Sequence, residues 1–204
     1  MLEFMLIGGS FAFAAAVQPG PLQAFLLARV AADGWRRTLP AALAPLISDG
    51  PIALLILLFL HNVARGFESF LKTVGGCVFL YFAAKTFLEW RGAREGSVHE
   101  AQSSPRTLLQ AVAVNIINPG PYLGWSLILG PLTLEAWAES PAHAFALVGS
   151  FYVVMVLSLS LFILLLGTTS FLGPRGRRSL LLASSFALAG IAIYSLWPAL
   201  NTLR

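Results

Sequence analysis

Long apolar runs separated by short charged clusters dominate this chain of 204 residues. Each run is about 20 residues long, the length at which an α-helix crosses a hydrocarbon layer of about 30 Å. The pattern predicts six transmembrane helices, near residues 5–28, 39–60, 69–88, 107–130, 142–166 and 180–199. Little sequence remains outside these runs, so we expect an all-α membrane protein with one transmembrane domain over residues 1–204.

Composition supports a membrane protein, because 57% of the residues are hydrophobic and 11% are charged. A soluble domain carries about 25% charged residues. The first run follows Glu3 and has no cation before it, so we expect it to be retained rather than cleaved as a signal peptide. The net charge of +4 reflects the cations of the loops, so we expect no nucleic-acid partner and a lipid bilayer instead.

The distribution of Lys and Arg predicts the orientation. The first, third and fifth loops, with their helix ends, hold most of the cations, namely Arg29, Arg36, Arg37, Lys85, Arg91, Arg94, Arg106, Arg175, Arg177 and Arg178. The opposite side holds Arg65, Lys72 and Arg204. Since cation-rich loops face the cytoplasm, both termini are predicted to lie outside. The fourth loop, expected over residues 131–142, carries acids and no cation, as an external loop should.

A short motif occurs twice at an offset of 100 residues, as Gln18-Pro-Gly-Pro21 and as Asn118-Pro-Gly-Pro121. Each copy opens a half of three predicted helices, so the second half is inverted relative to the first. Such inverted repeats are common in secondary transporters. We expect a first repeat at 1–90, a cytoplasmic linker at 91–106 and a second repeat at 107–204.

Proline removes a backbone donor and clashes with the preceding turn, so both motifs should break their helices. In hydrocarbon, the freed backbone groups are tolerated only beside protein or a water-filled cavity. Each break also starts a half-helix whose N-terminal amides could bind a carboxylate. The predicted substrate-binding residues are Gln18, Pro19, Gly20, Pro21, Gln23, Asn115, Asn118, Pro119, Gly120, Pro121 and Tyr122, with Trp125 and Ser126 beside them. The alternative is that both motifs are kinks that improve packing.

Asp49 lies near the middle of the second predicted helix, where a charge costs about 2.5–3.5 kcal/mol on insertion scales. It is a candidate for coupling transport to protons, or for binding an ammonium group. The alternative is a protonated acid with a structural hydrogen bond. Lys85 could reach the membrane surface, pair with Asp49 or hold a substrate carboxylate.

These residues resemble the LysE/RhtB-type amino-acid exporter family. The matching pieces are Gln18-Pro-Gly-Pro21, Ser48-Asp49-Gly50, Leu71 to Gly76 with Leu80-Tyr81, Asn118-Pro119, and Ala189-Gly190 with Tyr194. The resemblance covers all six predicted helices and implies ion- or proton-coupled export of amino acids across the bacterial inner membrane. Its motif positions correspond to Pro19, Gly20, Pro21, Asp49, Asn118 and Pro119. Many members have Asn-Pro-Lys where this chain has Asn118-Pro119-Gly120, and a hydroxyl residue where it has Gln18.

The leading hypothesis is therefore a secondary exporter of amino acids or similar small zwitterionic or carboxylate solutes. The alternatives are a membrane scaffold or accessory subunit and, because some relatives handle cadmium, a metal-cation exporter. An intramembrane enzyme is disfavoured, since the predicted helices bring together neither a nucleophile with a base nor two acids. With one cysteine and no metal-ligand spacing, we expect no metal and no cofactor. Whether the protein forms a homo-oligomer is left open.

Overall fold

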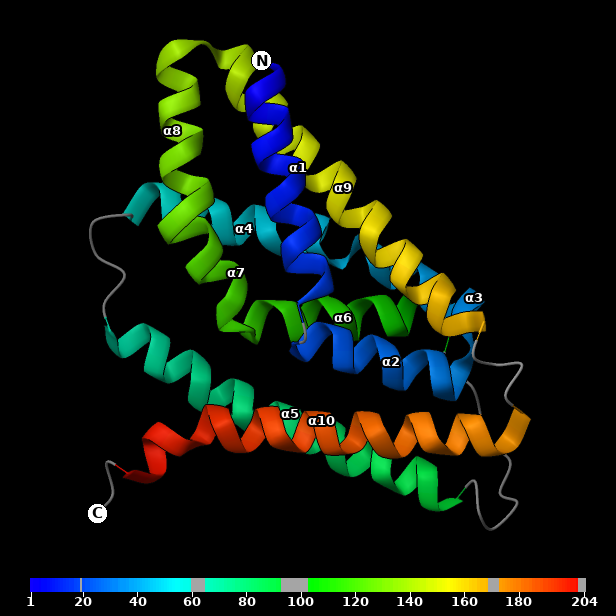
Figure 1. Ribbon diagram of the computed structural model, residues 1–204. Coiled ribbons are helices and arrows are strands. Elements are labelled where there is room, and N and C mark those ends of the chain that lie inside the picture. The colour runs from blue at the N-terminus through cyan, green and yellow to red at the C-terminus, as the bar shows by residue number, and fades with distance from the viewer. Residues whose placement is uncertain (19, 60–64, 93–102, 169–172, 202–204) are drawn as a thin grey trace.

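The computed structural model describes residues 1–18, 20–59, 65–92, 103–168 and 173–201, and these residues are helical with short connections (Figure 1). The first half contains α1 (Leu2–Val17), α2 (Pro21–Asp33), α3 (Trp35–Thr38), the 3₁₀ turn η1 (Leu39–Leu43), α4 (Ala44–Phe59) and α5 (Arg65–Gly92). The second half contains α6 (Ser104–Ile117), α7 (Pro119–Gly124), the π-helical turn η2 (Trp125–Leu129), α8 (Gly130–Glu139), α9 (Pro141–Thr168) and α10 (Gly173–Asn201).

Over the residues that the structure describes, the six predicted apolar runs coincide with helical segments, and the first and fourth are broken where the sequence predicted. Helices α1 and α2 meet at an angle of 58°. By length and hydropathy, the segment Trp35–Ile56 and helix α9 could each cross a membrane, and α1 with α2 could form a third span. Helices α5 and α10 have 28 and 29 residues, but over the described residues neither meets the same combined test of length and hydropathy. The arrangement of six spans in an inverted repeat stays a prediction.

The fourth segment continues further than predicted. Residues 131–142 were expected to form a loop, but α8 extends to Glu139 and α9 begins at Pro141, so this expectation is wrong. Pro131 does not end the helix because it follows the π-helical turn at Trp125–Leu129, where the hydrogen-bond register shifts and a missing N–H is tolerated.

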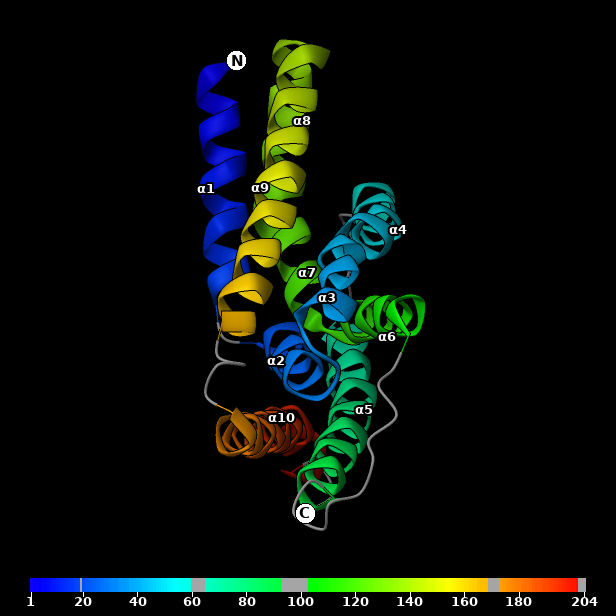
Figure 2. The same cartoon turned by 90° about the vertical axis from the view of Figure 1, so that its right-hand side faces the viewer.

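The helices pair across the two halves of the chain. Helix α1 packs along α9, α6 packs on η1 and α4, and α5 packs along α10, with α2 lying over α10 (Figures 1 and 2). Small residues permit the close pairs. A Cβ atom at Gly8 would overlap the backbone carbonyl of Leu147, and one at Gly76 would lie 2.6 Å from Cγ of Leu196. Close backbone approach at glycine is typical of helix pairs in membranes.

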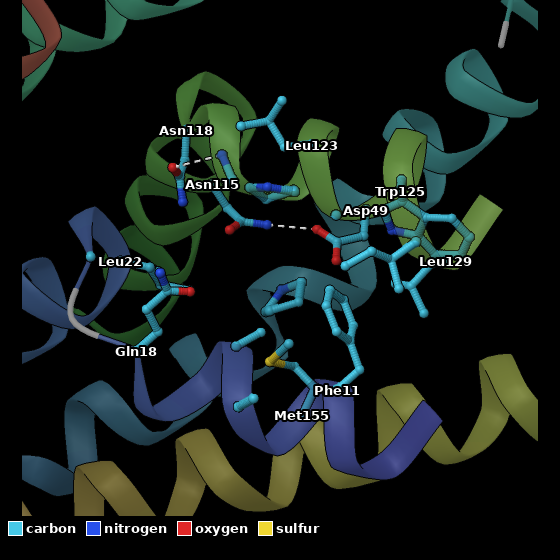
Figure 3. Close-up of a pocket in the computed structure, with 18 of the residues that line it drawn as sticks. Phe11, Gln18, Leu22, Asp49, Asn115, Asn118, Leu123, Trp125, Leu129 and Met155 are labelled. Carbon is cyan, nitrogen blue, oxygen red and sulfur yellow. Dashed lines mark hydrogen bonds between the residues drawn. The ribbon is translucent and has the colours of Figure 1, made fainter. Parts of the chain in front are cut away.

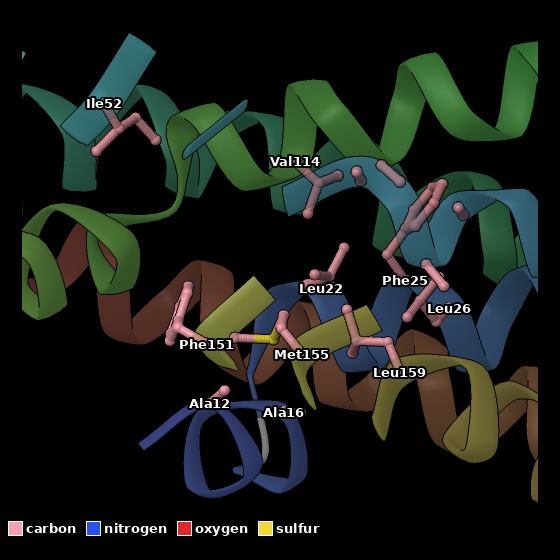
Figure 4. Close-up of a cluster of buried hydrophobic side chains, with 14 of the residues drawn as sticks. Ala12, Ala16, Leu22, Phe25, Leu26, Ile52, Val114, Phe151, Met155 and Leu159 are labelled. Atoms are coloured by element: carbon pink, nitrogen blue, oxygen red, sulfur yellow. The ribbon is translucent and has the colours of Figure 1, made fainter. Parts of the chain in front are cut away.

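The hydrophobic core lies where α1, α2, α4, α6 and α9 meet. Its largest buried side chains in this region include Phe25, Leu26 and Leu159, with Val114 and Met155 beside them (Figure 4). The outer faces are apolar as well. Leucine and phenylalanine side chains such as Leu6, Leu157 and Phe186 are more than half exposed. An outer surface so rich in large apolar side chains fits a lipid surrounding better than water.

A buried ion-pair network joins α2 to α5. The guanidinium of Arg29 contacts Asp33 at 3.2 Å and both carboxylate oxygens of Glu89 at 2.9 and 2.7 Å. Arg29 is 1% exposed, so this cation, predicted at the end of the first helix, is buried between helices. Asp33 on α2 and Glu89 on α5 stabilise the buried positive charge of Arg29. Lys85 of α5 lies within electrostatic range of this network.

Candidate functional site

At the first break, a side chain from the next helix donates hydrogen bonds to the backbone carbonyls that the break leaves without partners. At the end of α1, the Gln18 N–H donates to the carbonyl of Ala14 at 3.1 Å. The side-chain amide of Gln23 reaches back from α2 and donates to the carbonyls of Ala15 and Ala16, at 3.3 and 3.0 Å. Carbonyls freed by the break are thus satisfied, as they must be away from water.

The N-terminus of α2 is left open. Its N-cap residue is Gly20, which has no side chain that could cap the helix. Pro21 at the first helical position has no N–H. The next two amides, of Leu22 and Gln23, cannot bond within the helix, and the described residues provide no side-chain cap for them. This helix end can therefore donate to a carboxylate.

The second break differs, and here the expectation of bare amides is wrong. The side chain of Asn118 accepts a hydrogen bond from the Gly120 N–H at 3.1 Å. Pro119 and Pro121 have no N–H, so the first turn of α7 has a single donor and Asn118 already caps it. The side chain of Asn118 thus caps the helix that begins at the second break. Of the two helices that begin at the motifs, among the described residues, α2 alone has an uncapped N-terminus.

Asp49 of α4 is held by a hydrogen-bond network from α6 (Figure 3). The side-chain amide of Asn115 donates to Oδ1 of Asp49 at 2.7 Å and to the Ser48 hydroxyl at 2.7 Å. Ser48 in turn lies 3.4 Å from the same carboxylate oxygen and donates to the carbonyl of Ala44 at 2.9 Å. Asp49 is 3% exposed. The network links the two halves of the chain through a carboxyl group.

Both breaks and Asp49 line one cavity of about 450 Å³ (Figure 3). Of the predicted site residues, the lining includes Gln18, Gly20, Pro21, Gln23, Asp49, Asn115, Asn118, Gly120 and Pro121. Pro119 and Tyr122 are described but do not line it, and Pro19 lies outside the described residues. Tyr122 is buried without lining the cavity, whereas Trp125 faces it. The geometry thus gathers most of the predicted residues, and their roles in binding stay predictions.

Sequence reasoning missed the apolar wall of the cavity. Phe11 of α1 stacks on Phe151 of α9 with ring centroids 6.1 Å apart, and Trp125 meets Phe151 edge-on at 6.2 Å. Met155 lies one turn beyond Phe151. A signal existed for Phe11, because it lies two helical turns before Gln18 and so on the same face. For the residues of α9, nothing in the sequence distinguishes them from other apolar positions.

Trp125 brings a buried donor to this wall. Its indole N–H has no hydrogen-bond partner of normal geometry among the described residues, and the side chain is 3% exposed. The ring lies beside the carboxyl group of Asp49 (Figure 3). The indole N–H therefore faces the Asp49 carboxyl group and can help to stabilise a negative charge on it.

The charge in the cavity is confined to Asp49. No Lys, Arg or His is among the described residues that line it, and Lys85 lies instead with the Arg29 network, away from the cavity. Within the described part of the chain, no three His, Cys, Asp or Glu side chains are grouped so that they could hold a metal ion. The site therefore combines one acid, amide groups, an open helix N-terminus and an aromatic wall.

Comparison with known proteins identifies the family. The family model for the LysE type translocator matches residues 13–197. No curated protein and no solved structure gives a significant match. The matched region contains both helix breaks, Asp49 and every residue of the cavity except Phe11. The chain therefore belongs to the LysE family of membrane translocators.

Proposed function

We propose that this protein is a secondary transporter that exports amino acids, or similar small zwitterionic or carboxylate solutes, from the cytoplasm across the bacterial inner membrane. The observation that carries the proposal is a cavity that reaches both Pro-Gly-Pro breaks and holds the buried acid Asp49. Transporters of this general design place their substrates where broken helices meet near the membrane midplane.

The groups around the cavity match the two charges of a zwitterion. One oxygen of Asp49, Oδ1, accepts hydrogen bonds from Asn115 and Ser48, and the Trp125 indole lies beside the carboxyl group. This carboxyl group can also accept from a substrate ammonium. A substrate carboxylate finds donors in the uncapped N-terminus of α2.

Asp49 is also the candidate for coupling to the ion or proton gradient. It is the sole titratable group among the described residues that line the cavity. A buried carboxylate in a membrane is costly unless it is paired or protonated. We propose that Asp49 exchanges a proton for the substrate ammonium during the cycle, so that its carboxyl group is either protonated or paired with a cation.

The helix pairing suggests how the cavity could open to alternate sides. The first helix of each half packs on the second long helix of the other half, as α1 on α9 and α6 on α4. The two halves are therefore interlocked around the cavity, and rocking one set of pairs against the other would expose it in turn.

Two alternatives are weaker. A scaffold or accessory subunit has no need for a polar cavity between two repeat-equivalent breaks, which is the feature found here. A metal-cation exporter would need several ligating groups, and among the described residues Asp49 is the single acid of the cavity.

The test is efflux from proteoliposomes that contain the purified full-length protein and are loaded with one labelled amino acid at a time. Under an imposed proton gradient, wild type should release at least one amino acid faster than protein-free vesicles. Asp49→Asn keeps the size of the side chain and removes its charge, so gradient-driven efflux should be largely lost. Glu139→Gln, at an exposed carboxylate away from the cavity, is the control. If Asp49→Asn responds to the gradient as wild type does, the coupling role is wrong.

A further inference from the structure

One wall of the cavity is formed by aromatic and sulfur-containing side chains. Phe151 contacts both Phe11 and Trp125 through the ring pairs described above, and Met155 continues the wall along α9. Trp125 and Phe151 are each 3% exposed and Met155 is 7% exposed. This surface comes from three separate helical segments, so the fold assembles it at the site rather than along one helix face.

Such a wall favours an apolar group on the bound molecule. Its aromatic rings offer a large apolar area, and burying apolar groups of a solute against it is favourable. Sulfur of Met155 adds a flexible contact that adapts to aliphatic or aromatic shapes. The cavity volume of about 450 Å³ is within the range of sites that enclose small molecules.

Charge provides the second, independent restriction. With Asp49 as the one ionisable group among the described lining residues, the site can balance the ammonium of a zwitterion. A basic side chain would bring a second positive charge with no second acid. An acidic side chain would bring a second carboxylate, while Arg29 and Lys85 lie outside the cavity. An unpaired charge held in a buried site is strongly disfavoured.

From these two restrictions we infer that the exported solute is a neutral amino acid with an apolar side chain, aliphatic, thioether or aromatic. The side chain lies against Phe11, Phe151 and Met155, and the ammonium lies at Asp49. Phe11 is then a specificity-determining residue. This inference rests on the proposed export function and narrows it to one class of amino acid.

The experiment measures efflux from proteoliposomes of the full-length protein, loaded in parallel with leucine, methionine, phenylalanine, serine, lysine or glutamate. Leucine, methionine and phenylalanine should leave at least about tenfold faster than lysine or glutamate, which corresponds to 1.4 kcal/mol of discrimination. Lysine or glutamate efflux that equals or exceeds leucine efflux would overturn the inference and leave the export function standing. No efflux of any of these amino acids, compared with protein-free vesicles, would overturn both.

Substitutions of phenylalanine on α1 test the wall itself. Phe11→Ala should lower the ratio of leucine to serine efflux several-fold, because it removes apolar contact from the side-chain part of the cavity. Phe13→Ala is the matched control, since Phe13 lies on the same helix, is 54% exposed and does not line the cavity. Phe11→Leu should restore the ratio. The ratio does not depend on how much protein is reconstituted, and an unchanged ratio in Phe11→Ala would contradict the assignment.

Discussion

The hydrogen bond between Asn115 and Asp49 is the connection that a double-mutant cycle can measure. The two residues are 66 positions apart in sequence and bring α6 and α4 together at the cavity. Asn115 donates to the carboxylate of Asp49 and to the hydroxyl of Ser48, both at 2.7 Å, and it is 4% exposed. The cycle compares wild type with Asn115→Ala, Asp49→Ala and the double variant.

The expected size follows from the two bonds that Asn115→Ala removes. A hydrogen bond to a charged group contributes about 1.5–3 kcal/mol in soluble proteins and a neutral one about 0.5–1.5 kcal/mol. Inside membrane proteins the measured average is only about 0.6 kcal/mol, because the unfolded chain in the membrane also finds partners. We therefore expect Asn115→Ala to cost about 1–4 kcal/mol in total, with about 0.6–3 kcal/mol of this coupled to Asp49.

Equilibrium unfolding in mixed detergent micelles gives the four free energies. Asn118→Ala serves as the control, because Asn118 is in the same segment and its side chain accepts from Gly120 rather than contacting Asp49. Loss of this cap should cost about 1 kcal/mol and should add independently to Asp49→Ala. If Asn115→Ala and Asp49→Ala are also additive within about 0.5 kcal/mol, the hydrogen bond does not link the two halves and the description of the site is wrong.

Three other perturbations test the packing that supports the cavity. Arg29→Ala leaves two buried acids without their shared cation, so the free energy of unfolding in detergent should fall by about 3–5 kcal/mol. The control Arg37→Ala, at an exposed side chain, should change this free energy by less than about 0.5 kcal/mol. Gly8→Ala puts a methyl group onto the backbone of α9 and should cost about 1–3 kcal/mol in a thermal unfolding assay; Gly149→Ala, with nothing within 4 Å, should not. Gln23→Leu removes the donor to the last carbonyls of α1 and should cost about 1–3 kcal/mol by the same assay. Unchanged stability in any of the three buried variants would contradict the corresponding contact.

The features that the sequence predicted well are local. The Pro-Gly-Pro motifs act through the missing N–H and ring of proline, which operate within a few residues, so the breaks after Val17 and Ile117 could be placed from the sequence. The six apolar runs likewise recur as helical segments. Asp49 could be singled out because a mid-helix acid is costly in a membrane.

The features that the sequence did not predict depend on contacts between distant segments. The sequence placed Arg29 near a helix end but did not predict its buried ion pair, because its partner Glu89 is 60 positions away. The repeat suggested that both breaks would have the same backbone conformation. The capping of α7 by Asn118 was therefore not predicted. The aromatic wall combines α1, η2 and α9, and no periodicity in one helix reveals which apolar residues of another will face it.

The central claim is that an aqueous cavity between the two breaks holds the transported solute. Cys77 is the single cysteine, so Cys77→Ser gives a background in which Ala14→Cys and Leu123→Cys report on the α1 and α7 sides of the cavity. Ser103→Cys, at the exposed start of α6, is the reference thiol. We predict that a small polar thiosulfonate reagent modifies both cavity thiols, and that saturating leucine slows both reactions and leaves the reference unchanged. Failure of the reagent to reach either cavity thiol, or modification that no transported amino acid slows, would contradict the claim.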